Sequence, residues 1–135
     1  MKLGVIRMSK GEDKISSLLK SANISYEKEY TFSDLKYKGI PLRFDFAIKV
    51  NGKLILLEVD GQQHYTWIKK FGTYSDFKHM QENDRRKNSY CIRNNIPLIR
   101  IPYWDLDKIT IYSIFNNSNY LVKSKFHNDL LRPPY

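Results

Sequence analysis

The chain is short of cysteine, of long apolar runs and of acidic residues. Its one cysteine, Cys91, excludes an intramolecular disulfide framework, so we expect a reducing compartment with the cytoplasm as the default. No apolar run approaches the length of a membrane span, and the apolar stretch within residues 1–8 is too short for a signal peptide. We therefore expect no membrane partner.

Acidic residues number 14 against 23 lysines and arginines, which gives a formal net charge of +9. The positive charge is spread along the chain, and an extended basic surface attracts phosphates through counterion release. The length of 135 residues suits one domain, residues 1–135, and the ten tyrosines and seven phenylalanines argue against disorder. A polyanion such as DNA is the partner that this composition favours.

The order of local patterns predicts a mixed sheet flanked by helices, an α/β or α+β domain. Ser9 and Glu12 have the spacing of a capping box and begin a helix over residues 10–22. Two alternating runs, 42–50 and 53–60, form a hairpin around Asn51-Gly52. The other expected elements are a strand at 24–32, a loop or irregular crossing at 33–40, a long loop with one helical turn at 61–78, a helix at about 76–94, a strand at 97–101 and a helix at about 106–115.

The Asn51-Gly52 turn fixes the register of the hairpin. If Val50 faces Lys53, then Asp45 lies directly opposite Glu58, with their Cβ atoms roughly 4.5–5.5 Å apart. Two buried anions so placed are expensive unless a cation lies between them, and carboxylate oxygens suit Mg²⁺ or Mn²⁺. The alternative is a solvated ladder of ion pairs in which Arg43 or Lys49 neutralises them.

The same alternation divides the hairpin into two faces. One face is expected to be core and consists of Leu42, Phe44, Phe46, Ile48, Val50, Ile55, Leu57 and Val59. The other face is apolar at one end and charged at the other, and it consists of Arg43, Asp45, Ala47, Leu54, Leu56, Glu58 and Asp60. This gradient predicts a helix over the apolar half and a cleft beside the charged half.

Further candidates surround the two carboxylates. His64 follows a glycine at the end of the same strand and can accept a proton from attacking water or protonate a leaving oxygen. Asp60 either takes part in catalysis or forms a surface ion pair with Arg43. Three more residues each have two interpretations. Glu12 is either a third metal ligand or a helix cap. Asp84 and Lys87 either face inward or form an exposed pair.

The stretch from Tyr65 to Lys78 alternates aromatic residues with lysines. Such a loop can stack on bases while it binds phosphates, although its aromatics can equally pack over the sheet. The predicted DNA-binding residues are Arg43, Lys69, Lys70, Lys78, Arg85 and Arg86.

Several segments together resemble the PD-(D/E)XK nuclease superfamily, most closely the branch of the EDxHD homing endonucleases and very short patch repair endonucleases. They are Glu12, LRFDFAI at 42–48, LLEVDGQQHY at 56–65, Asp84 with Lys87, and PLIRIPY at 97–103. The resemblance implies a restriction-endonuclease-like αβββαβ core at about 9–103, followed by a C-terminal helix and tail at 104–135. It also implies metal ligation by Asp45 and Glu58, with Glu12, His64 and Asp84 in accessory catalytic positions.

One departure concerns the superfamily's lysine two residues after the second acid, which is Asp60 here. His64, or Lys87 from the following helix, would have to replace that lysine. The resemblance implies a Mg²⁺-dependent DNA endonuclease of homing or repair type, in a bacterial or phage-infected cell. Reading a long site would require a homodimer or another partner, and the alternative function is a non-catalytic DNA-binding or protein-binding module on the same fold.

Overall fold

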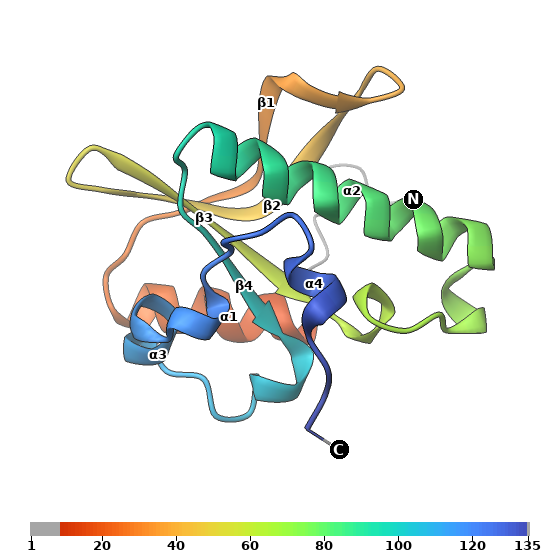
Figure 1. Ribbon diagram of the computed structural model, residues 1–135. Helices are drawn as coiled ribbons and strands as arrows, with labels where there is room; N and C mark the ends of the chain where they lie inside the picture. The colour runs from red at the N-terminus through yellow and green to blue at the C-terminus, as the bar shows by residue number, and fades with distance from the viewer. Residues whose placement is uncertain (1–8, 135) are drawn as a thin grey trace, which may run out of the picture.

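The computed structural model describes residues 9–134, and the segment 1–8 judged above for a signal peptide lies outside them. The elements follow the order αβββαβ and then two short helices (Figure 1). The helices are α1 (Lys10–Ser21), α2 (Tyr74–Arg93), α3 (Ile111–Asn116) and α4 (His127–Leu130), and the strands are β1 (Glu27–Tyr37), β2 (Ile40–Val50), β3 (Lys53–Asp60) and β4 (Leu98–Pro102).

The strands form one mixed sheet in the order β1-β2-β3-β4. β1, β2 and β3 pair antiparallel, whereas β3 and β4 pair parallel because α2 carries the chain across the sheet between them. α1 and α3 pack on one face through Ile15, Leu19 and Ile114, and α2 packs on the other through Tyr90 and Cys91. The structure therefore has the predicted fold class, a helix-flanked mixed sheet consistent with a restriction-endonuclease-like core.

The central hairpin has the predicted register. Val50 pairs with Lys53 and Phe46 with Leu57, around a turn in which Asn51 and Gly52 have φ of 52° and 77°. The loop expected at 33–40 is wrong, because β1 continues to Tyr37 and a second tight turn follows. Lys38 and Gly39 form that turn with φ of 51° and 78°, nearly the same backbone as Asn51-Gly52.

Other boundaries differ from the predicted ones. α2 begins at Tyr74, where Thr73 and Asp76 form a capping box, and two 3₁₀ turns at Gln62–His64 and Lys69–Phe71 interrupt the long loop before it. The helix expected from 106 begins only at Ile111, after a cap at Thr110. None of the helices within residues 9–134 is both long and apolar enough to cross a membrane.

The predicted division of the hairpin into two faces is wrong in β2. Leu42 and Phe44 pack in the cluster beneath α2, whereas Phe46 and Ile48 pack in the cluster beneath α1. The alternation breaks at Asp45, where the carboxylate accepts the Val59 N–H and the residue across the ladder, Glu29, has φ of 53°. This irregularity turns the first half of β2 towards α2.

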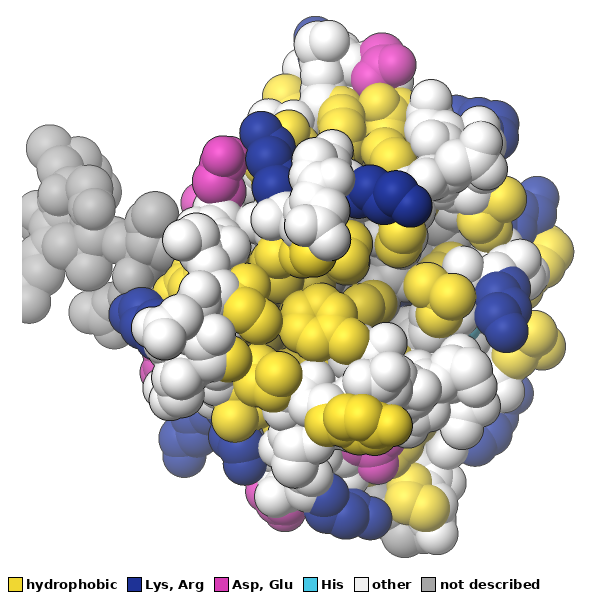
Figure 2. Space-filling view, turned by 90° about the vertical axis from the view of Figure 1, so that its left-hand side faces the viewer, with side chains coloured by type: hydrophobic (Ala, Val, Ile, Leu, Met, Phe, Trp, Pro, Cys, Tyr) yellow, Lys and Arg dark blue, Asp and Glu magenta, His cyan; other side chains and the backbone are white. Residues whose placement is uncertain are grey.

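Apolar side chains remain exposed on the face of the molecule that carries the β2–β3 turn. Figure 2 shows this face, with apolar side chains at its centre and lysines and arginines around them. Val50, beside the turn, is among the exposed hydrophobic residues. The clustered carboxylates do not lie on this face, because Glu58, Asp60 and Asp84 are buried on the α2 side of the sheet.

Candidate functional site

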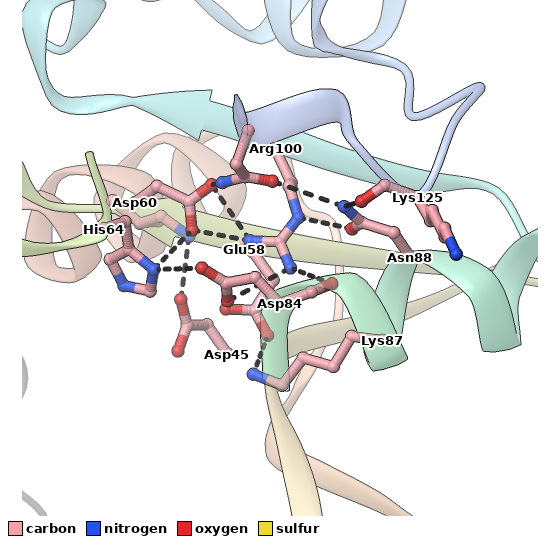
Figure 3. A network of polar contacts seen from close by, with 11 residues as sticks. Asp45, Glu58, Asp60, His64, Asp84, Lys87, Asn88, Arg100 and Lys125 are labelled. Carbon is pink, nitrogen blue, oxygen red and sulfur yellow. Dashed lines mark hydrogen bonds and ion pairs between the residues drawn. The ribbon is translucent and has the colours of Figure 1, made fainter. Parts of the chain in front are cut away.

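A groove of about 520 Å³ lies between the first half of β2 and the first four turns of α2. Asp45 from β2, His64 from the turn after β3, and Asp84 and Lys87 from α2 all line it. Figure 3 shows these side chains converging beneath α2. Glu58 lies directly behind Lys87 and is only 3% exposed. The structure thus brings together five of the residues predicted for the site.

Asp45 is the residue with the least compensated charge in this group. Its Oδ2 accepts the Val59 N–H at 2.7 Å. Burial, together with the negative charges of Glu58 and Glu12, nevertheless raises the pKa of Asp45 to about 8. At neutral pH this carboxyl is protonated unless a further cation approaches it.

Glu58 is paired with Lys87, whose Nζ lies 2.9 Å from Glu58 Oε1. Burial would lower the pKa of Lys87, but Glu58 and Asp84 together outweigh burial and raise that pKa, so the ammonium stays charged. Among the described residues, neither Asp45 nor Glu58 pairs with Arg43 or Lys49, which rules out the solvated ladder. Arg43 instead pairs with Glu29 at 3.5 Å on the surface.

A second polar network is centred on Arg100 of β4, which is fully buried. Its guanidinium donates to both oxygens of Asp60, at 2.7 and 3.0 Å, and to Asn88 Oδ1 at 2.8 Å. Asn128 donates to Asp60 Oδ2 at 2.9 Å. The predicted pairing of Asp60 with Arg43 is therefore wrong, because the parallel β3–β4 pairing places a stronger partner beside Asp60.

His64 joins this network to the groove. Its Nδ1 lies 2.8 Å from Asp84 Oδ2 and 3.6 Å from Asp60 Oδ1. Burial alone would lower the pKa of His64, but the charges of Asp60 and Asp84 outweigh it and raise this pKa to about 9. His64 is therefore an imidazolium at neutral pH, with Nδ1 donating to Asp84.

Asp84 is held as a carboxylate by the same contacts. Burial would raise its pKa, but Arg100 and His64 outweigh burial and lower the pKa of Asp84 to about 2. The stripe of Asp84, Lys87 and Cys91 on α2 faces inward, as one of the two predictions for it stated.

Glu12 takes part in the predicted cap of α1, whereas its role as a third ligand stays a prediction. Ser9 caps α1 by accepting the Glu12 N–H, and the Glu12 carboxylate forms an ion pair with Lys28 at 2.7 Å. Its negative charge also contributes to the raised pKa of Asp45. Glu12 therefore lies near the carboxylate pair while it remains bound to Lys28.

Four of the predicted DNA-binding residues are exposed, and the other two are half-buried against other side chains. Arg43, Lys69, Lys70 and Lys78 are exposed, and Arg43 lines the groove. Arg85 is engaged by Asp129 at 2.9 Å and by Glu82 at 3.0 Å, so its charge is already neutralised. Arg86 stacks on the Tyr37 ring at 4.1 Å.

The aromatic loop contains both exposed and packed rings. Trp67, Phe71 and Tyr74 are exposed beyond His64, and Trp67 lies edge-on to Tyr74. Tyr65 instead packs against Trp104, 4.8 Å between ring centroids. The packing alternative is therefore correct for Tyr65, and the outer rings remain accessible.

The oxygen atoms around Asp45 fit a hard divalent cation. Asp45 Oδ1 and Glu58 Oε2 accept no hydrogen bond from any residue of the described part of the chain. No group of three or more His, Cys, Asp or Glu side chains within residues 9–134 is arranged to hold a metal. Two carboxylates nevertheless match Mg²⁺, which proteins often bind through one or two carboxylates together with substrate phosphates.

Three residues of the site were not predicted from the sequence: Arg100, Asn88 and Asn128. Arg100 had one sequence signal, since it is the only charged residue in the apolar strand LIRIP. A fully buried arginine requires buried carboxylates around it. Asn88 and Asn128 lie on α2 and α4 and gave no signal of their own.

Comparisons of this chain with protein-family models, with curated proteins and with solved structures found no significant match. The chemistry of the residues themselves therefore carries the proposal that follows.

Proposed function

We propose that this protein is a Mg²⁺- or Mn²⁺-dependent endodeoxyribonuclease. The observation that carries the proposal is a pair of carboxylates, half-buried Asp45 and buried Glu58, at a groove in a chain with a formal charge of +9. Asp45 and Glu58 would hold the metal. When bound, a divalent cation would supply activation of water and stabilisation of charge on the phosphate.

His64 is suited to be a general acid. Its raised pKa keeps it protonated at neutral pH, so it can give a proton to the leaving oxygen rather than take one from water. Asp84 accepts from Nδ1 and so orients the ring, which leaves Nε2 as the atom that would transfer the proton. Of the two roles open to His64, the electrostatics favour this one.

Lys87 is the better replacement for the lysine missing at position 60. It comes from α2 rather than from β3, yet its ammonium lies beside Glu58 and lines the groove. From there it can stabilise negative charge on the phosphodiester during attack. Asp60, bound to Arg100, takes the separate role of holding the network in place.

DNA is the proposed partner because cations border the groove. Arg43 lies on the β2 side and lines the groove, Lys78 lies on α2, and Lys69 and Lys70 lie beyond His64. These side chains would bind phosphates without reading sequence. A homing or repair setting in a phage or mobile element, the cytoplasm of the host cell, and a homodimer for long sites are further parts of this proposal, taken from the sequence resemblance and from the single cysteine.

A cleavage assay tests the proposal. Purified protein with Mg²⁺ or Mn²⁺ is expected to nick or cut supercoiled, branched or mismatched DNA, and Asp45→Ala is expected to lose on the order of a thousandfold in rate. Asp107→Ala removes an exposed acid elsewhere and serves as the matched control. Equal cutting by Asp45→Ala and the wild-type protein would end the assignment.

The second candidate is a DNA-binding module without turnover, which Asp60 in the place of the motif lysine favours. Such a module has no reason to bind a divalent cation between β2 and β3. Metal binding that depends on Asp45 and Glu58 therefore separates the two functions.

A further inference from the structure

The second tight turn of the molecule lies at the end of the candidate groove. We define the arm as residues 36–41, in which Lys36 pairs with Pro41 and Tyr37 with Ile40 around the Lys38-Gly39 turn. A register shift between Thr31 and Lys36 separates the arm from the rest of the β1–β2 ladder. In Figure 1 this hairpin extends beyond α2 at the top of the view.

The arm and the candidate site share one continuous wall. Ile40 and Pro41 line the same groove as Asp45 and His64, and β2 connects them directly. At about 3.3 Å per residue, Ile40 lies roughly 17 Å along the strand from Asp45. A duplex with a phosphodiester at Asp45 would therefore pass the arm about five base pairs away, at roughly 3.4 Å per pair.

The side chains of the arm are held ready for an anionic partner. Tyr37 packs against Arg86, 4.1 Å from its ring centroid, and His79, 6.3 Å between centroids, and Lys38 Nζ lies 5.4 Å from the same ring centroid. Lys36 and Lys38 are exposed, and neither forms an ion pair with a carboxylate within residues 9–134. Ile40 is 68% exposed.

These features suit a duplex better than a single strand. Proteins bind single strands by stacking bases on free aromatic rings, but the one aromatic ring of the arm is half-buried and already packs against Arg86 and His79. A two-stranded ribbon fits the major groove, where lysines contact phosphate or guanine and an aliphatic side chain contacts the thymine methyl group. We propose that the arm is a second contact with duplex DNA, inserted at its groove; this inference rests on the proposed nuclease function.

The β2–β3 turn provides a matched control within the same chain. Two lysines, Lys49 and Lys53, flank the Asn51-Gly52 turn. In the arm, Lys36 lies beside the turn and Lys38 lies in it, and this turn is at the opposite end of β2. Lys38→Asn creates an Asn-Gly turn, which tolerates the positive φ at this position. The double variants Lys36→Ala/Lys38→Asn and Lys49→Ala/Lys53→Ala therefore remove the same charge from two similar turns.

The experiment measures binding in EDTA, where cleavage does not interfere, by fluorescence anisotropy with a 30-base-pair duplex and a 30-nucleotide single strand. We expect the arm variant to bind the duplex at least about tenfold more weakly near 0.1 M salt, with a salt slope smaller by about 2, and the β2–β3 variant to change less than about twofold. The arm variant is expected to lose less affinity for the single strand than for the duplex.

Three results would overturn the inference: equal losses in both double variants, no loss in the arm variant, or an equal loss on single-stranded DNA. In each of these cases the proposed nuclease function is tested separately, by an assay of DNA cleavage by the wild-type protein with Mg²⁺. A wild-type protein that neither binds the duplex nor cuts DNA would refute the proposed function and the role of the arm together.

Discussion

Two pairs of carboxylates lie beneath α2, and they differ in how their charge is balanced. Asp60 and Asp84 face two cations, Arg100 and His64, at distances of 2.7 to 3.6 Å. Asp45 and Glu58 have one directly bound cation, Lys87, and the charge of Glu12 adds to the imbalance.

The pKa values express this difference. In the balanced pair, Arg100 and His64 overcome burial and lower the pKa of Asp84 to about 2. In the other pair, burial and Glu58 raise the pKa of Asp45 to about 8. A network whose charges are all paired stabilises the fold. A group with a strongly perturbed pKa beside a groove instead indicates a candidate functional site. Changes that affect one pair without the other test this distinction.

The largest expected effect on stability comes from the balanced pair. Arg100→Met leaves Asp60 and Asp84 buried without their main cation and is expected to cost about 3–5 kcal/mol of unfolding free energy. Urea denaturation measures this loss. The control is Arg43→Met, an exposed arginine whose ion pair with Glu29 is worth at most about 1 kcal/mol. Similar losses for the two variants would show that the Arg100 network does not hold the fold.

The next effect is on pH dependence, through His64. Its pKa is about 9 in the folded protein and 6.5 in the unfolded chain, so its contribution is complete below pH 6.5 and is lost as pH rises to 9. We expect stability to fall by up to about 3 kcal/mol over this range. Asp45, with its raised pKa, adds a fall in the same direction between about pH 4 and pH 8.

Thermal unfolding from pH 5 to pH 9 separates the two groups. His64→Gln should make the fall between pH 6.5 and 9 shallower and leave the part due to Asp45, which extends to about pH 8. An unchanged profile in His64→Gln would mean that Asp60 and Asp84 do not hold a proton on this ring.

The smallest expected effect concerns the stability of Asp45→Asn. Since the carboxyl is costly to ionise where it lies, a neutral amide should raise stability by about 1–2 kcal/mol at pH 8 without divalent metal, while DNA cleavage is lost. Asp84→Asn is the contrast, because it removes a carboxylate that Arg100 and His64 need, and it should destabilise. Destabilisation by both variants would show that the two carboxylate pairs do not differ in charge balance.

The sequence reveals the unbalanced pair more readily than the balanced one. Asn51-Gly52 is a local signal, and from it the register and the closeness of Asp45 to Glu58 follow. Arg100 meets Asp60 only through the parallel pairing of β4 with β3, after α2 has crossed the sheet, and no local pattern specifies that neighbour. The class of fold could therefore be predicted, while half of the polar network could not.

Two local errors have physical causes as well. Lys38 adopts a positive φ that lysine seldom takes, so the second turn carried no recognisable signal beyond its glycine. The alternation in β2 fails at Asp45 because its carboxylate, rather than a backbone carbonyl, accepts the Val59 N–H. Both departures lie along the groove, where the chain's local preferences give way to the arrangement of the candidate site.

Electron paramagnetic resonance of Mn²⁺ at pH 8 shows whether Asp45 and Glu58 hold a divalent cation, since it counts bound ions without requiring a known DNA target. We expect the wild-type protein and the Asp107→Asn control to bind Mn²⁺, and Asp45→Asn and Glu58→Gln both to lose this binding. Undiminished Mn²⁺ binding by the Asp45→Asn/Glu58→Gln double variant, or no binding by the wild-type protein in the presence of DNA, would contradict this expectation.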